Sequence, residues 1–308
     1  MPRRHFALFN AVNVALYAVL LICWPSFGRA QDYPTKPVQV VVGFPPGSTV
    51  DMLVRPIAAQ LSTDLGEKFV VENRPGATGI IANGLVAKAA PDGYTLLVAP
   101  SSSLTSVPYL HLHMPYSLKD FVPIAQMNAF PYVLLVNPTV PVKNVKELIA
   151  LARARPGVLT FGSSGVGSGF HLAGVLFDHM AKVRMLHVPY KGGNLALTDL
   201  IAGRIDLMFY SLAVAEPQIK AGKVRAIAVT GRHRDPLMPE LPTISASGLP
   251  GYNMTGWHGW FAPTGTPLAI VTKLNATIER ILATPQIRHL WARYGMSVVL
   301  STSERLAT

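Results

Sequence analysis

Short apolar runs alternate with amphipathic stretches along most of the chain. The apolar runs predict buried strands at Val38–Val42, Lys68–Val71, Thr95–Val98, Tyr132–Val136, Leu159–Phe161, Arg184–Val188, Leu207–Phe209 and Arg225–Thr230. Between them, apolar residues recur at spacings of three and four, which predicts helices at Asp51–Leu65, Gly79–Ala89, Val145–Arg155, His171–Ala181, Ala196–Ala202 and Val214–Ala221. This alternation is typical of parallel sheets covered by helices, so the predicted fold class is α/β.

After Gly231 the pattern weakens into sequence rich in turn residues. It resumes with an aromatic strand at Gly256–Ala262 and with helices at Pro267–Leu282 and Pro285–Tyr294. One α/β unit, a second unit and a return segment predict two domains, the first of which is discontinuous. The expected boundaries are 31–130 with 236–308 for domain 1, and 131–235 for domain 2.

Two stretches share one design, in which an apolar strand, a Gly/Ser-rich turn and an amphipathic helix follow one another. They run from Val38 to Leu61 and from Leu159 to Phe177. Each turn places unpaired backbone N–H groups and small hydroxyls at a helix N-terminus, where the helix dipole favours negative charge. Ligands of parallel α/β sheets bind outside the carboxyl ends of the strands, where both turns would lie. The candidate ligand-binding residues are Gly47, Ser48 and Thr49 in the first turn and Ser163, Ser164, Gly165, Gly167 and Ser168 in the second.

Helix capping is the alternative interpretation of these serines. Ser48 with Asp51 resembles a capping box, and Ser168 is placed as an N-cap three residues before His171. Capping requires one small polar residue, whereas the second turn is rich in glycine, which leaves room for a ligand near the backbone. Further candidates are Ser102 and Ser103 in a polar turn after the third strand, His171 at the start of the second helix, and Tyr190 after the strand Arg184–Val188.

The composition is that of a folded protein, with 50% apolar and 14% charged residues in a chain of 308. The formal net charge is +11. The basic residues are scattered and form no Lys/Arg run, so we expect a field that attracts small anions and no nucleic-acid partner.

The N-terminus has the order of regions found in a secretory signal peptide. Two arginines precede the apolar run Phe6–Trp24, and the small residues Gly28 and Ala30 follow it. We therefore expect residues 1–30 to be removed by cleavage after Ala30, an uncleaved membrane anchor being the alternative. The single cysteine, Cys23, lies within this segment, so the mature chain would have no disulfide and no thiolate chemistry.

A serine-dependent hydrolase is the rival interpretation, because the serines of the second turn lie near His171 and Asp178 in the sequence. The chain has no Gly-x-Ser-x-Gly elbow there, so we expect no catalysis. The second turn also lacks the third glycine of a dinucleotide-binding fingerprint, and we expect no cofactor. His111 and His113 are spaced like metal ligands, but no third ligand follows nearby, and we expect no metal.

Several motifs match one known family in order along the chain. They are Gly43–Gly47, Val71–Ala77, Ala90–Thr95, Ser163–Gly165 with His171–Gly174, Val188–Gly192, Ala221–Lys223 and Gly248–Tyr252. From about Tyr33 onward, the chain resembles the substrate-binding receptors of tripartite tricarboxylate transporters, also called Bug receptors. The resemblance implies a type II-like periplasmic binding protein, or Venus flytrap, whose two α/β domains close on a small carboxylated solute. Such a receptor would be a periplasmic monomer without a cofactor that passes its ligand to the membrane subunits of the transporter.

The chain departs from the family pattern at several positions. Gly47–Asp51 stands where the family usually has Gly-Gly-Gly-Thr-Asp, and Tyr210 stands where an acid often follows the strand. Tyr210 is therefore a further candidate ligand-binding residue. Because a tyrosine cannot pair with an ammonium group as an acid would, it predicts a ligand that has a carboxylate but no ammonium group, and an aromatic ligand is one option. The chain ends at Thr308, soon after Ser303 would open the family's last helix. A ligand sensor for a membrane kinase is the alternative to a transport receptor that the sequence leaves open.

Overall fold

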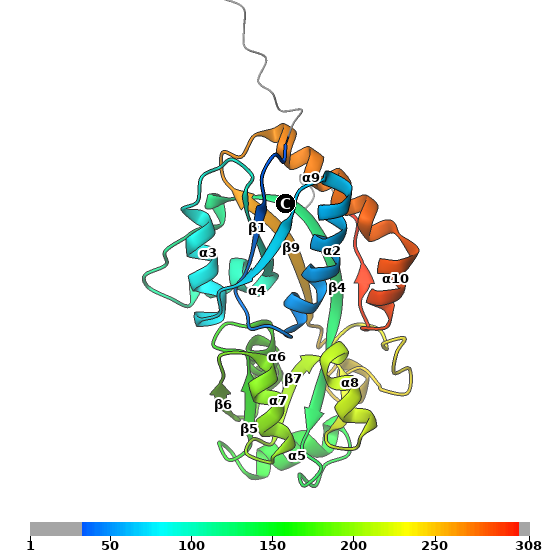
Figure 1. The fold of residues 1–308 in the computed structure, drawn as a ribbon. Helices are drawn as coiled ribbons and strands as arrows, with labels where there is room; N and C mark the ends of the chain where they lie inside the picture. Colours follow the sequence, from blue (N-terminus) through cyan, green and yellow to red (C-terminus); the bar gives the residue numbers. More distant parts are fainter. Residues whose placement is uncertain (1–32, 302–308) are drawn as a thin grey trace, which may run out of the picture. The chain divides into compact units, whose positions relative to one another are not determined.

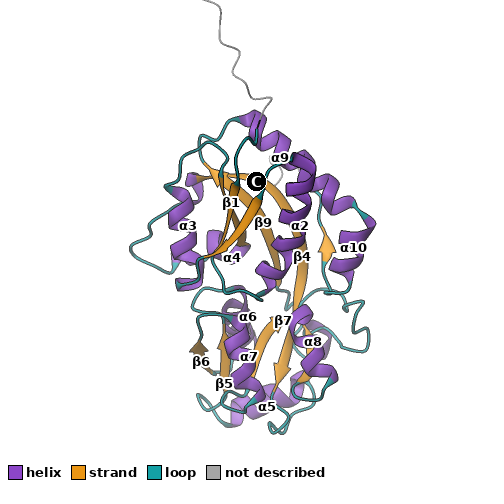
Figure 2. Ribbon diagram, in the orientation of Figure 1, coloured by secondary structure: helices purple, strands orange, loops and turns teal. Residues whose placement is uncertain are grey.

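The computed structural model describes residues 33–301, and the fold lies in the unit Pro34–Thr308. The expected signal peptide at 1–30 lies outside the described residues, as do Cys23 and Ser303, where the family's last helix would open. Figure 1 shows the order of the elements, and Figure 2 distinguishes helices from strands. No helix in the described part of the chain is long and apolar enough to cross a bilayer.

The first sheet is built around β1 (Val38–Val42). This strand pairs in parallel with β2 (Phe69–Asn73) and with β3 (Thr95–Pro100). Its valines are fully buried, as expected for a central parallel strand that helices cover. Helices α2 (Thr49–Leu65) and α3 (Ile80–Ala87) pack against it and connect the three strands.

The second sheet repeats this parallel arrangement. β5 (Thr160–Ser163) pairs in parallel with β6 (Leu186–Pro189) and with β7 (Leu207–Ser211). The other elements of this region are α5 (Val145–Ala154), α6 (Gly169–Ala181), α7 (Gly193–Ile201), α8 (Leu212–Lys220) and β8 (Arg225–Val229). In both sheets, each Gly/Ser-rich turn follows the carboxyl end of a parallel strand and leads into a helix N-terminus.

One long strand, β4 (Phe121–Val136), belongs to both sheets. Its first part pairs antiparallel with β9 (Thr255–Pro263), as far as Pro131. Its second part, beginning at Tyr132, pairs antiparallel with β7 and β8. The two sheets are therefore continuous through β4, which Figure 1 shows running from one to the other.

The C-terminal segment completes the first sheet. β9 pairs with β3, and after it α9 (Leu268–Ala283) packs on α2 and β4. α10 (Pro285–Ala292) follows, and β10 (Ser297–Val298) pairs with β4. Trp260 of β9 and Trp291 of α10 are fully buried and anchor this segment in the core.

The structure corrects parts of the predicted element pattern. The sheets are mixed and not purely parallel, because β4 and β9 carry the chain between the sheets and back and pair antiparallel with their neighbours. The polar turn at Ser101–Ser103 is the start of a short helix, α4 (Ser101–Thr105). The first part of β4 is an unpredicted strand, and register shifts after Pro123 and Gln126 explain why its residues show no regular period of two.

Candidate functional site

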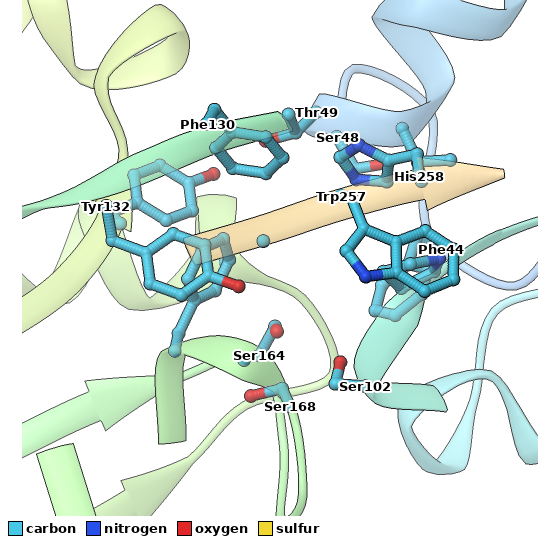
Figure 3. Close-up of a pocket in the computed structure, with 17 residues that line it drawn as sticks. Phe44, Ser48, Thr49, Ser102, Phe130, Tyr132, Ser164, Ser168, Trp257 and His258 are labelled. Carbon is cyan, nitrogen blue, oxygen red and sulfur yellow. The ribbon is translucent and has the colours of Figure 1, made fainter. Parts of the chain in front are cut away.

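A cavity of about 50 Å³ lies where helix N-termini from the two sheets meet. Residues of both Gly/Ser-rich turns line it, together with residues of β4 and β9 and of the starts of α4 and α7. Figure 3 shows Ser102, Ser164 and Ser168 on one side of the cavity and Ser48 and Thr49 on the other. The two predicted turns therefore face the same cavity.

A buried carboxylate shapes the first turn. Asp51 is 3% exposed and accepts hydrogen bonds from the Gly47 N–H at 2.9 Å and from Arg55 Nε and Nη2 at 3.0 and 2.8 Å. Asn73 Nδ2 donates both to Asp51 Oδ1 and to the carbonyl of Phe44, each at 2.9 Å. Burial opposes ionisation of Asp51, but these hydrogen bonds and the charge of Arg55 outweigh it and hold the pKa of the carboxyl below its usual value. An ionised Asp51 thus fixes the path from strand to helix.

Ser48 is the N-cap residue of α2, yet its side chain makes no capping bond, so the expected capping box with Asp51 does not form. The reason is that the Asp51 carboxylate binds the N–H of Gly47, one residue earlier. Ser48 is 9% exposed, and its Oγ has no hydrogen-bond partner. A buried hydroxyl without a partner costs about 1–3 kcal/mol. Because Ser48 lines the cavity, its hydroxyl is available to a group bound there.

Backbone geometry that favours glycine gives the second turn its path. Gly165 and Gly167 have φ angles of 118° and 80°. The Oγ of the fully buried Ser163 accepts from the Gly165 N–H and donates to the Gly165 carbonyl, both at 3.1 Å. The Gly167 N–H donates to His171 Nδ1 at 3.1 Å. These four residues shape the turn and are not part of the cavity lining.

Ser168 caps α6 as predicted, since the His171 N–H donates to its Oγ at 3.2 Å. Ser168 is 2% exposed and lines the cavity beside Ser164. Its Oγ is the acceptor in the capping bond, so its hydroxyl proton remains available for a ligand oxygen. Gly169 and Phe170 also line the cavity, and their N–H groups, in the first turn of α6, have no partner within the helix.

Other candidate residues lie outside the lining. Ser103 is fully buried, and its Oγ donates to the carbonyl of the residue before α4 at 3.0 Å. The Tyr190 phenol donates to Asp199 Oδ2 at 2.8 Å. The candidates that do line the cavity are Ser48, Thr49, Ser102, Ser164, Ser168 and Tyr210.

Hydrogen bonds at the edge of the cavity join elements of the first sheet to elements of the second. Asn194 Nδ2 donates to the Gly47 carbonyl at 3.0 Å, and Asn194 Oδ1 accepts from the Tyr210 phenol. Thr78 Oγ1 donates to the carbonyl of Val166 at 2.9 Å. Thr78 has a φ of 55°, which is uncommon for a residue other than glycine. The first turn is thus tied to Tyr210, a cavity residue that belongs to the second sheet.

The lining of the cavity is electrically neutral. Among the described residues that form it there is no Asp, Glu, Lys or Arg. Burial lowers the pKa of His258 to about 3 and raises the pKa values of Tyr132 and Tyr210 above their usual value. All three side chains are therefore uncharged near pH 7, and attraction for an anion comes from the helix N-termini and the hydroxyls.

Comparison with known proteins identifies the family of this chain. The family profile described as "Tripartite tricarboxylate transporter family receptor" matches residues 53–308. The chain belongs to the tripartite tricarboxylate transporter receptor family. The receptor's location is periplasmic, as it is for its solved structural neighbours.

Individual relatives agree with this assignment. A protein from the tcbD-tcbE intergenic region of Pseudomonas sp. strain P51 is 41% identical over 297 residues, which cover 95% of the receptor and 88% of the relative. The solved structure of a periplasmic transporter has 36% identity and a TM-score of 0.85, covering 89% and 92% of the two chains. R. palustris Rpa4515, solved with adipate, has 37% identity and a TM-score of 0.84 with the same coverage. The receptor therefore has the predicted two-domain α/β fold of periplasmic binding proteins.

The receptor does contain a serine next to an imidazole. Ser163 Oγ lies 2.7 Å from His187 Nε2. The serine is fully buried, however, and its Oγ is engaged with the backbone of Gly165. This hydrogen-bonded pair stabilises the turn and does not place a nucleophile in the cavity, so the geometry does not favour the hydrolase interpretation.

The sequence interpretation missed the aromatic side chains of the receptor's cavity. They are Phe44, Phe130, Tyr132, Phe170, Trp257 and His258. Phe44 and Phe170 lie next to the predicted turns in the sequence, so their place in the cavity lining could have been predicted. Phe130, Tyr132 and Trp257 come from long strands, and no local pattern tells which face of those strands meets the cavity.

Proposed function

We propose that the receptor captures a small organic carboxylate in this cavity and delivers it to the membrane subunits of a tripartite tricarboxylate-type transporter. The observation that carries the proposal is the unpaired, buried Ser48 hydroxyl at the N-terminus of α2, facing the N-terminus of α6 across one cavity. Helix N-termini favour anions, and a carboxylate accepts hydrogen bonds from N–H and hydroxyl groups alike. The adipate in Rpa4515 is a carboxylate, which supports this ligand class.

In this proposal the two turns hold one carboxylate jointly. Ser48 and Thr49 would contact it from the first turn, and Ser164 and Ser168 from the second. Because the turns belong to different sheets, segments 31–130 and 236–308 would act as one domain and 131–235 as the other, closing on the ligand. The receptor would work as a monomer, because one chain supplies both turns.

A screen of small organic acids tests the proposal. An acid present at about a hundred times its dissociation constant is expected to raise the free energy of unfolding by about 2.7 kcal/mol, because it binds only the folded chain. Thermal-shift measurements followed by calorimetry would detect this. The methyl ester of the best acid is the matched control, and it should give a much smaller shift because it has no anionic charge. The proposal would be contradicted if the ester stabilised the protein as much as the acid does. It would also be contradicted if no acid in the screen stabilised the protein.

Export with cleavage after Ala30 makes a separate prediction. The regions that precede Gln31 have the order of a signal peptide. N-terminal sequencing of the protein recovered from the periplasm is expected to begin at Gln31. Membrane-bound protein that still carries Met1 would show instead that the segment remains as an anchor.

A further inference from the structure

A continuous row of aromatic rings forms much of the cavity wall. The His258 ring stacks on Phe130, with centroids 5.1 Å apart and planes at 8°. Phe130 meets Tyr132 edge to face at 5.5 Å, and Tyr132 meets Phe170 in the same way at 5.0 Å. Phe170 then contacts Tyr210 at 5.1 Å. The row crosses from β9 through β4 and α6 to β7, and Figure 3 shows Phe130, Tyr132 and His258 around the open space.

Neighbouring glycines leave the space that these rings occupy. A Cβ atom added at Gly169 or at Gly256 would collide with the phenol oxygen of Tyr132, so this ring fits only because both positions are glycine. A Cβ atom added at Gly193 would collide with the ring of Tyr210 in the same way. Gly193, the first residue of α7, lines the cavity beside the Tyr210 ring, and the N-termini of the longer helices α2 and α6 line it as well.

The polar groups of the lining fit one carboxylate and no second charge. The N-terminus of α2, with the unpaired and nine-tenths buried Ser48 hydroxyl, and the N-terminus of α6, with Ser168, can hold a carboxylate between them. A second carboxylate would be buried against aromatic rings without a cation, which is costly. An ammonium group would find no carboxylate among the described lining residues.

We infer that the ligand is a monocarboxylate that carries a single aromatic ring, an acid of the benzoate type, whose ring packs on this row. The inference rests on the proposed function and narrows it to one ligand class. Aromatic pairs prefer the edge-to-face and offset contacts that the wall offers.

Titration calorimetry with four probes tests this ligand class. Benzoate is expected to bind at least tenfold more tightly than adipate or malate, and phenylalanine is expected to bind most weakly. Tighter binding of adipate or malate would overturn the aromatic inference and leave the proposed function standing. Failure of every carboxylate to bind would overturn both.

Removing one ring of the wall tests the contact itself. Phe170→Leu keeps an apolar side chain but loses the ring, so it should weaken benzoate binding roughly three- to tenfold and cyclohexanecarboxylate binding less. Trp257→Leu, at a partly exposed position of the lining, is a second variant with less risk to folding. Tyr109→Leu is the matched control, since Tyr109 is 88% exposed and outside the cavity, and it should bind like wild type. Equal losses for both acids in the two ring variants would overturn the inference.

Discussion

Replacing Ser168 with alanine is expected to weaken binding of the best organic acid ten- to a hundredfold. A hydroxyl that donates to a charged oxygen contributes about 1.5–3 kcal/mol, which corresponds to that range of affinity. The unliganded protein should lose only about 1 kcal/mol, because the capping bond from the His171 N–H disappears. Calorimetric titration gives the first quantity, and urea unfolding gives the second.

Ser48→Ala is the matched variant, because Ser48 occupies the same place at the start of α2 without making a capping bond. Its removal should weaken ligand binding by a similar factor. It should leave the stability of the unliganded protein unchanged or slightly higher, since an unpaired buried hydroxyl is lost. Wild-type affinity in both variants would mean that neither hydroxyl contacts the ligand, and the argument for a carboxylate site between the two serines would fail.

Lowering the pH from 7 to 4.5 is expected to destabilise the folded receptor by on the order of 2 kcal/mol. Burial lowers the pKa of His258 to about 3, and burial together with the charge of His171 lowers the pKa of His187 to about 4. A histidine in the unfolded chain titrates near pH 6.5. Below that pH the unfolded chain binds protons that the folded chain excludes, so stability falls until the folded pKa values are reached.

Two considerations keep the expected loss modest. His187 is partly exposed, so solvent screening reduces its contribution. Burial raises the pKa of the Asp178 carboxyl to about 6, so protonation of this group stabilises the folded state as the pH falls below that value. Urea unfolding at several pH values measures the net effect. His187→Gln should show a shallower loss between pH 6.5 and 4, whereas a variant of the exposed His113 should not. An unchanged slope in His187→Gln would mean that His187 titrates normally in the folded state.

The two turns could be predicted because their signal is local. Glycine, serine and a following amphipathic helix stand together in the sequence, and the structure places both turns at one cavity. The role of each serine could not be read from that signal. Ser163 and Ser164 are adjacent, but Ser163 ends β5 and turns toward His187, while Ser164 lines the cavity. That difference depends on strand register, which neighbouring strands determine.

The contacts that join the two sheets were beyond local prediction. Asn194 lies 147 residues from Gly47, and Thr78 lies 88 residues from Val166. No periodicity or motif links segments so far apart. The aromatic wall has the same character, since its rings come from β9, β4, α6 and β7 and meet only in the folded chain.

The place where β4 changes partners lies within this wall. Phe130 is opposite Gly256 of β9, and Tyr132 is opposite Ser211 of β7. Pro131 between them has no N–H to give to either ladder, so β4 lacks one ladder hydrogen bond where it changes partners. Rotation of one sheet relative to the other would bend the strand at Pro131 and change the angle between the two rings. A ligand packed on both rings would resist that rotation, so the stiffness of the backbone at 130–132 and the occupancy of the cavity are mechanically coupled.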